Sequence, residues 1–486
     1  METKRLLDSQ KDCAKSDREK DIKKKALQED KVRWRSIKII YITMLLSAME
    51  YSITLPSLWP YLQQVDKKVS AQFLGIVAGG FSICQMIGSF LFGIWCLYRP
   101  AIEPFVAAAA LRFLGNFLYV FAENCPGNGG KILILVSKLI VGLSTGDMAV
   151  CRAVLSQATT KDERKGAFAV MAGMQVLGYA VGPAFQSAAV PLVGKGLHYF
   201  GLNIDIFNIP GWIGIVVEII NILLIFIWFK EYNIDVHDNR ENLPKPNTGA
   251  VLVTTMAYYV LFSVFAMLET MTAPLIADEF ALSKDKVVFY AGIILSSLAV
   301  IVLATFWVIK FASNRIRERT VLLTGYVIML VAFIIFLPWG SEHPPLQVKE
   351  TIDVGNLTKT VLSEGCPIRY SWCKTTPKIY LSQYIIAMLI GFIGFALPSM
   401  VINSLYSKII GPRKQGLYMA LASCAGSFAR FTGPLVMTSL YANFGPRWLF
   451  IFLASVNLSA AALIFGFFKM LVPFEEITNL SLYDEL

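Results

Sequence analysis

Long apolar runs are the feature that most constrains the fold of this chain. About twelve of them follow one another, each with roughly the 20 apolar residues that a helix needs to cross a bilayer. Charged residues make up only 16% of the 486 residues, too few to cover the surface of soluble domains. The sequence therefore predicts an all-α membrane protein with twelve transmembrane helices. The expected spans are 37–60, 72–97, 102–122, 132–156, 167–191, 210–229, 250–276, 286–311, 320–340, 378–406, 415–440 and 446–470.

Polar stretches divide the chain into two halves and two tails. Residues 1–36 are polar, lysine-rich and mixed in sign, which predicts a disordered tail. Residues 37–230 and 250–472 each hold six apolar runs and form the expected halves. A polar linker, 231–249, joins them, and 473–486 form a second tail.

Charge and cysteine placement predict the orientation in the membrane. Lys and Arg concentrate in the N-terminal tail and in alternate loops, which places both termini in the cytosol. The loop 341–377 then lies on the opposite side. It carries a glycosylation acceptor at Asn356 and the pair Cys366 and Cys373, features typical of a lumenal or extracellular compartment. We expect a glycan on Asn356 and a disulfide between the two cysteines.

An internal repeat relates the two halves. Ala48-Met49, with Thr54 and Pro56, recurs 218 positions later as Ala266-Met267, with Thr272 and Pro274. The segment 178–183 recurs 251 positions later as 429–434, and both end in Gly-Pro. Two such halves, with a binding site between them near the membrane mid-plane, are typical of transporters.

These features resemble the major facilitator superfamily of membrane transporters. Lys138-x3-Gly142-x3-Gly146 is similar to its helix-4 motif, and Gly178-x3-Gly182-Pro183 to a helix-5 motif common in antiporters. The loop after the second run keeps Gly93 and Arg99, but Leu97 replaces the usual acidic residue. The resemblance implies a gating or helix-packing role for Gly93, Arg99, Lys138, Gly142, Gly178, Gly182, Pro183, Gly433 and Pro434.

Further segments are similar to a lysosomal branch of this superfamily, among them 59–63, 405–409 and 445–448. That resemblance implies residence in late endosomes and lysosomes and an anion conductance, chiefly for chloride. The tail begins with an acidic dileucine pattern formed by Glu2, Leu6 and Leu7. The pattern predicts a lysosomal sorting signal that a clathrin adaptor recognises.

Charged side chains inside apolar spans are costly, so they are candidates for the functional site. Glu269 precedes Pro274 and is expected to titrate a proton or face the substrate, whereas Arg430 supplies a fixed positive charge for an anion. The resemblance also favours Glu50, Asp147 and Arg152, which lie on cavity-lining helices, over Glu218, whose helix usually faces lipid. The alternative is a set of charge pairs that only hold helices together.

The remaining motifs leave three kinds of function open. No phosphate loop, zinc spacing or nucleophile motif occurs, so no enzyme, cofactor or metal is expected. The first function is an endolysosomal protein that moves a small solute or ion, such as chloride. The second is a proton-coupled, alternating-access transporter of an organic solute, and the third is a non-transporting sensor or scaffold. The expected partners are the lipid bilayer, a small solute or ion and a clathrin adaptor, without nucleic acid.

Overall fold

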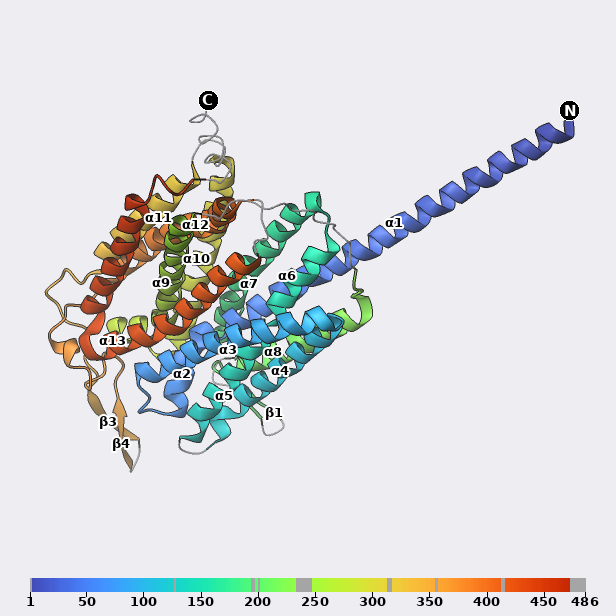
Figure 1. Cartoon of the computed structure of the whole chain (residues 1–486). Coiled ribbons are helices and arrows are strands. Elements are labelled where there is room, and N and C mark those ends of the chain that lie inside the picture. The colour runs from blue at the N-terminus through green and yellow to red at the C-terminus, as the bar shows by residue number, and fades with distance from the viewer. Residues whose placement is uncertain are drawn as a thin grey trace.

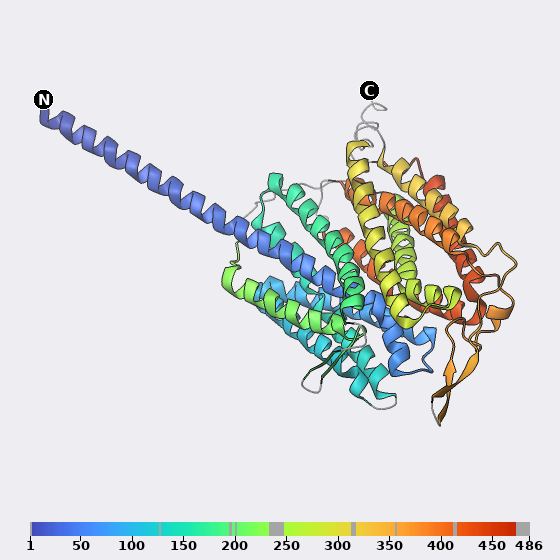
Figure 2. The same cartoon turned by 180° about the vertical axis from the view of Figure 1, so that it is seen from behind.

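The protein is a bundle of long helices that fall into two consecutive groups (Figures 1 and 2). Structural statements concern the residues that the computed structural model describes, which are 2–125, 128–193, 197–199, 202–232, 247–312, 317–354, 357–411 and 416–472.

The first group forms the N-terminal half. Its first span is interrupted between α1 and α2 because Pro56 in the first turn of α2 has no backbone N–H to continue the helix. The fourth span consists of two helices, α5 and α6, separated at Thr145-Gly146. The helices are α1 (Glu2–Ile53), α2 (Leu55–Val65), α3 (Ala71–Tyr98), α4 (Ile102–Val120), α5 (Gly129–Ser144), α6 (Asp147–Ala158), α7 (Lys161–Val193) and α8 (Ile209–Trp228).

The second group forms the C-terminal half. Its last helix bends at Gly445, where φ is 80°. An added Cβ there would lie 2.6 Å from Trp372 Cγ, so both the backbone angle and the close approach require glycine. The helices are α9 (Thr248–Phe280), α10 (Lys284–Ala312), α11 (Glu318–Phe336), α12 (Leu381–Ile410) and α13 (Gly416–Gly466).

The expected membrane spans are present. The described residues contain 11 helical segments that are long and apolar enough to cross a membrane. The last of them, Leu421–Gly466, contains two spans, because the bend at Gly445 divides it. The prediction of an all-α membrane fold with twelve transmembrane helices is therefore confirmed.

Short structures outside the spans distinguish the two ends of the bundle. Two antiparallel hairpins pair β1 (Leu197–Tyr199) with β2 (Leu202–Ile204), and β3 (Lys349–Val354) with β4 (Leu357–Leu362). The end that carries β3 and β4 is called the hairpin face. The opposite end, where α3 and α10 finish, is called the terminal face (Figure 1). Two short 3-10 helices, Phe121–Asn124 and Ser371–Lys374, also lie toward the hairpin face.

The N-terminal tail differs from the expected disorder. Helix α1 extends back through the tail to Glu2 and projects from the body beyond the terminal face (Figure 1). The physical reason lies in the composition: residues 2–36 contain no Gly or Pro and are rich in Lys, Glu, Gln, Arg, Ala and Leu, which favour helix. High charge lowers the hydrophobicity of a segment without lowering its helix propensity.

Four helix pairs organise the bundle. Within the halves, α1 packs against α7, and α9 packs against α13. Between the halves, α3 packs against α13, and α7 packs against α10. Under the sequence repeat, α1 corresponds to α9, α3 to α10, and α7 to α13. The repeat therefore relates the two contacts within the halves to each other, and likewise the two contacts between the halves.

Candidate functional site

The sequence repeat corresponds to a repeated helix contact. In the first half, Gly178 and Gly182 of α7 lie against α1, with Gly182 next to Met49. In the second half, Gly433 of α13 lies against α9, next to Met267. The two methionines stand 218 positions apart and Gly182 and Gly433 stand 251 apart, which are the offsets of the repeat. Equivalent residues therefore join equivalent helices in the two halves.

Residues related by the same offsets meet between the halves. The Tyr51 hydroxyl of α1 donates a 2.9 Å hydrogen bond to Glu269 Oε2 of α9, 218 positions away. Tyr179 of α7 packs edge-on against Tyr51, with ring centroids 5.8 Å apart. Arg430 of α13 stands 251 positions after Tyr179 and interacts electrostatically with Tyr179, Tyr51 and Glu269. We call Tyr51, Tyr179, Glu269 and Arg430 the inter-half centre.

Arg430 is held by aromatic rings. Its guanidinium lies over Phe262 and Phe265 of α9, 5.1 and 5.8 Å from the ring centroids. Within the described part of the chain it makes no ion pair at 4.0 Å or less, although Glu269 is close enough to interact with it. Both side chains are partly exposed. A guanidinium that is fixed by rings and lacks a bound carboxylate keeps its N–H donors for an anion.

Arg152 adds a second positive charge beside this centre. It lies in α6, is exposed, and interacts electrostatically with Tyr258 of α9, as Arg430 does. Because Arg152 belongs to the first half and faces a tyrosine of the second half, it lies between the two halves. The structure thus brings Arg152, Glu269 and Arg430 to one region, as the sequence predicted.

Glu50 and Asp147 lie elsewhere, inside the N-terminal half. Both interact with Arg112 of α4: Asp147 Oδ2 is 2.8 Å from Nη2, and Glu50 Oε2 is 3.6 Å from Nε. Glu218 of α8 completes the group, with Oε1 2.8 Å from Arg112 Nη1. We call Glu50, Arg112, Asp147 and Glu218 the N-half ion cluster. Its members are at most 3% exposed, so in this conformation they do not face the region between the halves.

The position of Glu218 corrects a prediction. Its helix was expected to face lipid, yet Glu218 is fully buried. The reason is that α8 has two faces: Pro210, Gly211, Gly214 and Glu218 lie on a buried face toward α4, and its aliphatic residues such as Leu223 cover the outside. A helix on the outside of a bundle still presents one stripe to its neighbours.

Lys138 and Gly142 stabilise the first span and its neighbours. Lys138 Nζ donates a 2.7 Å hydrogen bond to Thr54 Oγ1, at the break between α1 and α2, and lies 4.8 Å from the centroid of Tyr119. Gly142 allows α5 to approach the backbone of Phe81 in α3. Both residues therefore lie in contacts between helices of this half.

A matched pair of contacts closes the hairpin face. Gly75 of α3 lies against the Pro434 carbonyl and the Thr438 hydroxyl of α13. Gly292 of α10 lies against the Pro183 carbonyl and the Ser187 hydroxyl of α7. Pro183 and Ser187 stand 251 positions before Pro434 and Thr438, so the repeat relates the two contacts. We call them the hairpin-face contacts.

A loop of the second half adds to this closure. Arg369 donates to the carbonyls of Lys68 and Val69, at 3.2 and 2.6 Å, in the turn before α3. A disulfide joins Cys366 and Cys373 on either side of Arg369, and both cysteines are buried. The expected glycosylation site, Asn356, lies outside the described residues.

At the terminal face the predicted gating residues are not packed between the halves. A Cβ at Gly93 would meet nothing within 4 Å, so in this conformation Gly93 is not a packing position. Among the described residues, the ion pair of Arg99 is an exposed contact of 3.6 Å with Glu103 in the next helix. Arg33 of α1 contacts Glu163 of α7 within the first half, at 2.8 and 3.0 Å, and these hydrogen bonds lower the pKa of the Glu163 carboxyl to about 2.

The halves are therefore packed together at the hairpin face, whereas the contacts described above at the terminal face lie within one half. Of the dileucine pattern, Glu2, Leu6 and Leu7 lie in the first turns of α1, but their side chains are outside the described residues.

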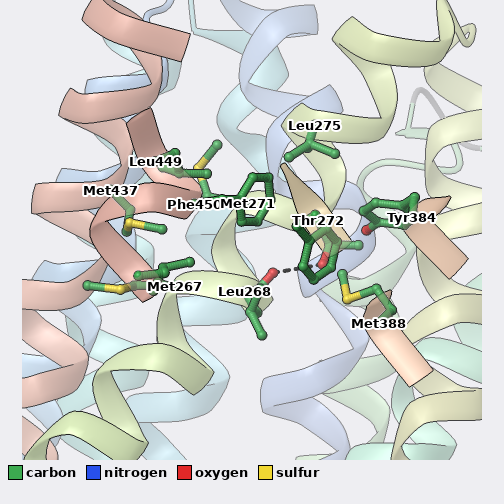
Figure 3. Close-up of a pocket in the computed structure, with 12 residues that line it drawn as sticks. Met267, Leu268, Met271, Thr272, Leu275, Tyr384, Met388, Met437, Leu449 and Phe450 are labelled. Atoms are coloured by element: carbon green, nitrogen blue, oxygen red, sulfur yellow. Dashed lines mark hydrogen bonds between the residues drawn. The ribbon is translucent and has the colours of Figure 1, made fainter. Parts of the chain in front are cut away.

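A small apolar cavity lies inside the C-terminal half (Figure 3). Its lining includes Met267, Met271, Tyr384, Met388 and Met437 from α9, α12 and α13. The cavity measures about 10 Å³, room for a water molecule and not for an organic solute. The described residues also contain no group of three or more His, Cys, Asp or Glu that could hold a metal ion.

Sequence reasoning missed the partners of its own candidates. Tyr51 and Tyr179 carry no charge, so a search for charges in apolar spans passes over them. The repeat contained the signal, because Tyr51 and Glu269 are equivalent positions, and so are Tyr179 and Arg430. The three partners of Arg112 were not predicted either, because they lie on three other helices.

Two repeated helical halves, closed at one face and with charged residues between them, define a secondary transporter. The family profile of the Major Facilitator Superfamily matches residues 40–347, and the chain belongs to that superfamily. The resemblance found in the sequence is confirmed. As a member, the protein is a multi-pass membrane protein that transports a solute.

Among individual proteins, the chain is closely related to Major facilitator superfamily domain-containing protein 8 of Xenopus laevis. The two are 35% identical over 475 residues, which cover 91% of this chain and 93% of the relative. Two solved structures share the fold. The human organic anion transporter MFSD10 (TETRAN) is 16% identical, with TM-score 0.59, over 89% of this chain and 99% of that one. A bacterial homologue of the human lysosomal transporter Spinster, inward-facing and unoccupied, is 12% identical, with TM-score 0.63, over 90% and 98%.

Proposed function

We propose that this protein is a secondary transporter of the endolysosomal membrane that moves a small anion by alternating access. Chloride is the simplest anion of this class. The observation that carries the proposal is Arg430, whose guanidinium is fixed over Phe262 and Phe265 and forms no ion pair within the described residues. It lies where equivalent helices of the two halves meet, and a site there is exposed to each side in turn as the halves rock.

Glu269 makes proton coupling part of the proposal. Its carboxyl group interacts electrostatically with Arg430, on the side where an anion binds. A carboxylate beside a bound anion repels it, whereas a protonated carboxyl does not. Binding of the anion and of a proton to Glu269 therefore favour each other, and the two move in the same direction.

An organic anion is the second candidate substrate. The inter-half centre is rich in rings, with Tyr51, Tyr179, Tyr258 and Phe262 close to Arg430. Rings of this kind also suit an organic carboxylate or sulfonate. One structural neighbour is described as an organic anion transporter.

The orientation and location follow from the sequence signals. We infer that the terminal face is cytosolic and the hairpin face lumenal, since Lys and Arg concentrate in the N-terminal tail and alternate loops. Lysosomal residence is supported by the segments that resemble a lysosomal branch of the superfamily and by the dileucine pattern, which recruits a clathrin adaptor. Replacing Leu6 and Leu7 with Ala is expected to move the protein to the plasma membrane, as seen by surface labelling.

Flux into proteoliposomes tests the transport proposal. In Arg430→Gln, uptake of chloride and of small organic anions is expected to fall at least about tenfold, because a loss of 1.4 kcal/mol of anion binding gives that factor. Arg430→Lys retains the charge and should retain part of the flux. Arg447→Gln removes an exposed charge outside the centre and serves as the matched control. Equal flux in Arg430→Gln and in the unmodified protein would refute the anion site.

Electrical recording separates a transporter from a channel and from a scaffold. A transporter with coupled protons gives a reversal potential that shifts with the pH gradient, and Glu269→Gln abolishes that shift. A reversal potential fixed at the chloride equilibrium value indicates an uncoupled conductance. Absence of flux together with normal cellular function of Arg430→Gln indicates a sensor or scaffold.

A further inference from the structure

The N-half ion cluster carries more negative than positive charge. Three carboxyl groups, those of Glu50, Asp147 and Glu218, surround the single guanidinium of Arg112. Lys138 of α5 also interacts electrostatically with Glu50, which brings the positive charges to two. With every group ionised, one negative charge is left over in a site that is at most 3% exposed. A buried charge without a partner is strongly unfavourable, so the site requires one more positive charge.

The hydrogen bonds show where that charge belongs. One oxygen of each carboxyl is occupied: Glu50 Oε1 accepts from Asn116, Glu218 Oε1 from Arg112 at 2.8 Å, and Asp147 Oδ2 from Ser47 at 2.8 Å. The second oxygens, Glu50 Oε2 and Glu218 Oε2, are buried and accept no hydrogen bond.

The carboxyl groups of Glu50 and Glu218 lie within hydrogen-bonding reach of each other. Two carboxylates are both acceptors and repel. One proton between them turns this contact into a hydrogen bond and satisfies both groups. Asp147 Oδ1 is also without a partner, but Asp147 already pairs with Arg112 at 2.8 Å.

We propose that Glu50 and Glu218 hold one shared proton, and that this pair is a proton-binding site separate from the inter-half centre. Its role in transport rests on the proposed function, whereas its occupancy by a proton does not.

Helix α1 connects this site to the inter-half centre. Glu50 and Tyr51 are adjacent in α1, and Glu50 enters the N-half ion cluster while Tyr51 donates to Glu269 at 2.9 Å in the other half. The helix ends at Ile53, and Lys138 contacts the break at Thr54. Loss of the shared proton leaves two facing carboxylates, which push α1 away from α8. Movement of α1 then displaces Tyr51 from its partner in the second half.

The surroundings favour exchange of the proton only during the conformational cycle. The ionisable groups that face the pair are Arg112 and Tyr119 on α4, Lys138 on α5, and Asp147 and Cys151 on α6. All of them are buried, as are Glu50 and Glu218, which are at most 3% exposed. The proton is therefore retained while the hairpin face is closed and exchanges when α1 separates from α4 and α8.

Infrared spectroscopy of the purified full-length protein tests the occupancy. A carbonyl band of a protonated carboxyl, shifted in heavy water, is expected at neutral pH. Glu50→Gln and Glu218→Gln should each remove the whole shared-proton band, because the amide N–H₂ of either glutamine donates to the remaining carboxylate in place of the proton. Glu103→Gln, at an exposed position, is the matched control and keeps the band.

Flux measurements test the role in transport. In proteoliposomes, either glutamine variant is expected to lose at least about tenfold of the acceleration that a pH gradient gives to anion flux, a change of about 1.4 kcal/mol in coupling. The proposal is overturned if the unmodified protein lacks the acid band at neutral pH, or if both glutamine variants keep it. Unchanged pH acceleration in both variants overturns the transport role. A band that disappears in both variants of a protein without anion flux supports the proton site and refutes the proposed function.

Discussion

The hairpin-face contacts allow a quantitative prediction about conformational balance. A Cβ at Gly75 would overlap Thr438 Oγ1 and lie 2.9 Å from the Pro434 carbonyl oxygen. At Gly292 it would overlap Ser187 Oγ and lie 2.7 Å from the Pro183 carbonyl oxygen. Ordinary contact begins near 3.4 Å, so helices α3 and α13, or α10 and α7, must separate by at least 0.5–0.7 Å. Because the obstacle includes backbone carbonyls, a rotamer change cannot remove it.

The expected magnitude follows from the cost of overpacking. Adding a methyl group to a well-packed contact costs about 1–3 kcal/mol. That cost applies to the conformation closed at the hairpin face and not to one in which the halves have separated there. Gly75→Ala and Gly292→Ala are each expected to lower the population of the closed conformation, relative to the open one, by about 5–150-fold. Flux then falls, since the cycle needs both conformations.

Spin-label distances measure this shift. Labels at Asn128 in the first half and Ser341 in the second, both exposed near the hairpin face, should report a longer distance in each alanine variant. Gly166→Ala and Gly173→Ala are the controls, because a Cβ at either position meets nothing within 4 Å. Thr438→Ala should rescue Gly75→Ala only in part, since the Pro434 carbonyl remains. Distances that are unchanged in both Gly75→Ala and Gly292→Ala, or equally changed in the controls, would show that these contacts do not set the balance.

Three further outcomes are expected outside the spans. Cys366→Ser, or Cys373→Ser, should cost about 2–3 kcal/mol of stability, because that is the amount that closure of a short loop supplies. Thermal unfolding under non-reducing conditions measures the loss. An unchanged melting temperature would argue against a structural disulfide. Glu163→Gln should cost about 1 kcal/mol, because Arg33 loses one of its two carboxylate partners and keeps Asp30. Because the pKa of Glu163 is lowered to about 2, this contribution is fully present above its ordinary pKa of 4.5 and is lost as the pH falls toward 2. The difference in melting temperature between the unmodified protein and Glu163→Gln should therefore be equal at pH 7 and pH 5. A difference that vanishes at pH 5 would contradict the pairing. Asn356→Gln should abolish a glycosidase-sensitive shift in mobility, and a shift that persists would place the glycan elsewhere.

The sequence predicted the helices well because length and apolarity are local properties. Each span is a long apolar run. Neither its length nor its apolarity depends on which helices pack beside it. For the tail, the high charge favoured disorder, whereas the structure continues α1 through it, since Lys and Glu are good helix formers in a segment without Gly or Pro. Breaks inside a span, such as that at Thr54, depend on a following proline, and Pro56 was visible in the sequence.

The candidate site was predicted only in part, because partners are a matter of geometry. Glu269 and Arg430 were chosen for their charge and do lie close together. Glu50 was chosen by the same rule, yet it faces the other way from its neighbour Tyr51, which a period of 3.6 residues per turn makes possible. Which face of α1 or α8 meets which helix depends on packing, and no property of Glu218 alone distinguishes a lipid-facing carboxyl from one paired to Arg112.

The two halves are equivalent in their backbone contacts and different in their chemistry. The repeat relates Gly182 to Gly433, and the contacts of Gly75 to those of Gly292, so the moving parts are duplicated. At the inter-half centre, however, tyrosines of the first half stand opposite Glu269 and Arg430 of the second. Inside the halves the charged groups lie in the first half and not in the second. The first half encloses the N-half ion cluster, and the second encloses methionine and aromatic side chains around a small apolar cavity (Figure 3). A symmetric scaffold lets the halves rock about one axis, and the asymmetric charges let each half handle a different ion. On this argument the second half contributes the anion site with Glu269 beside it, the first half contributes the separate proton site of Glu50 and Glu218, and α1, which reaches both, couples them.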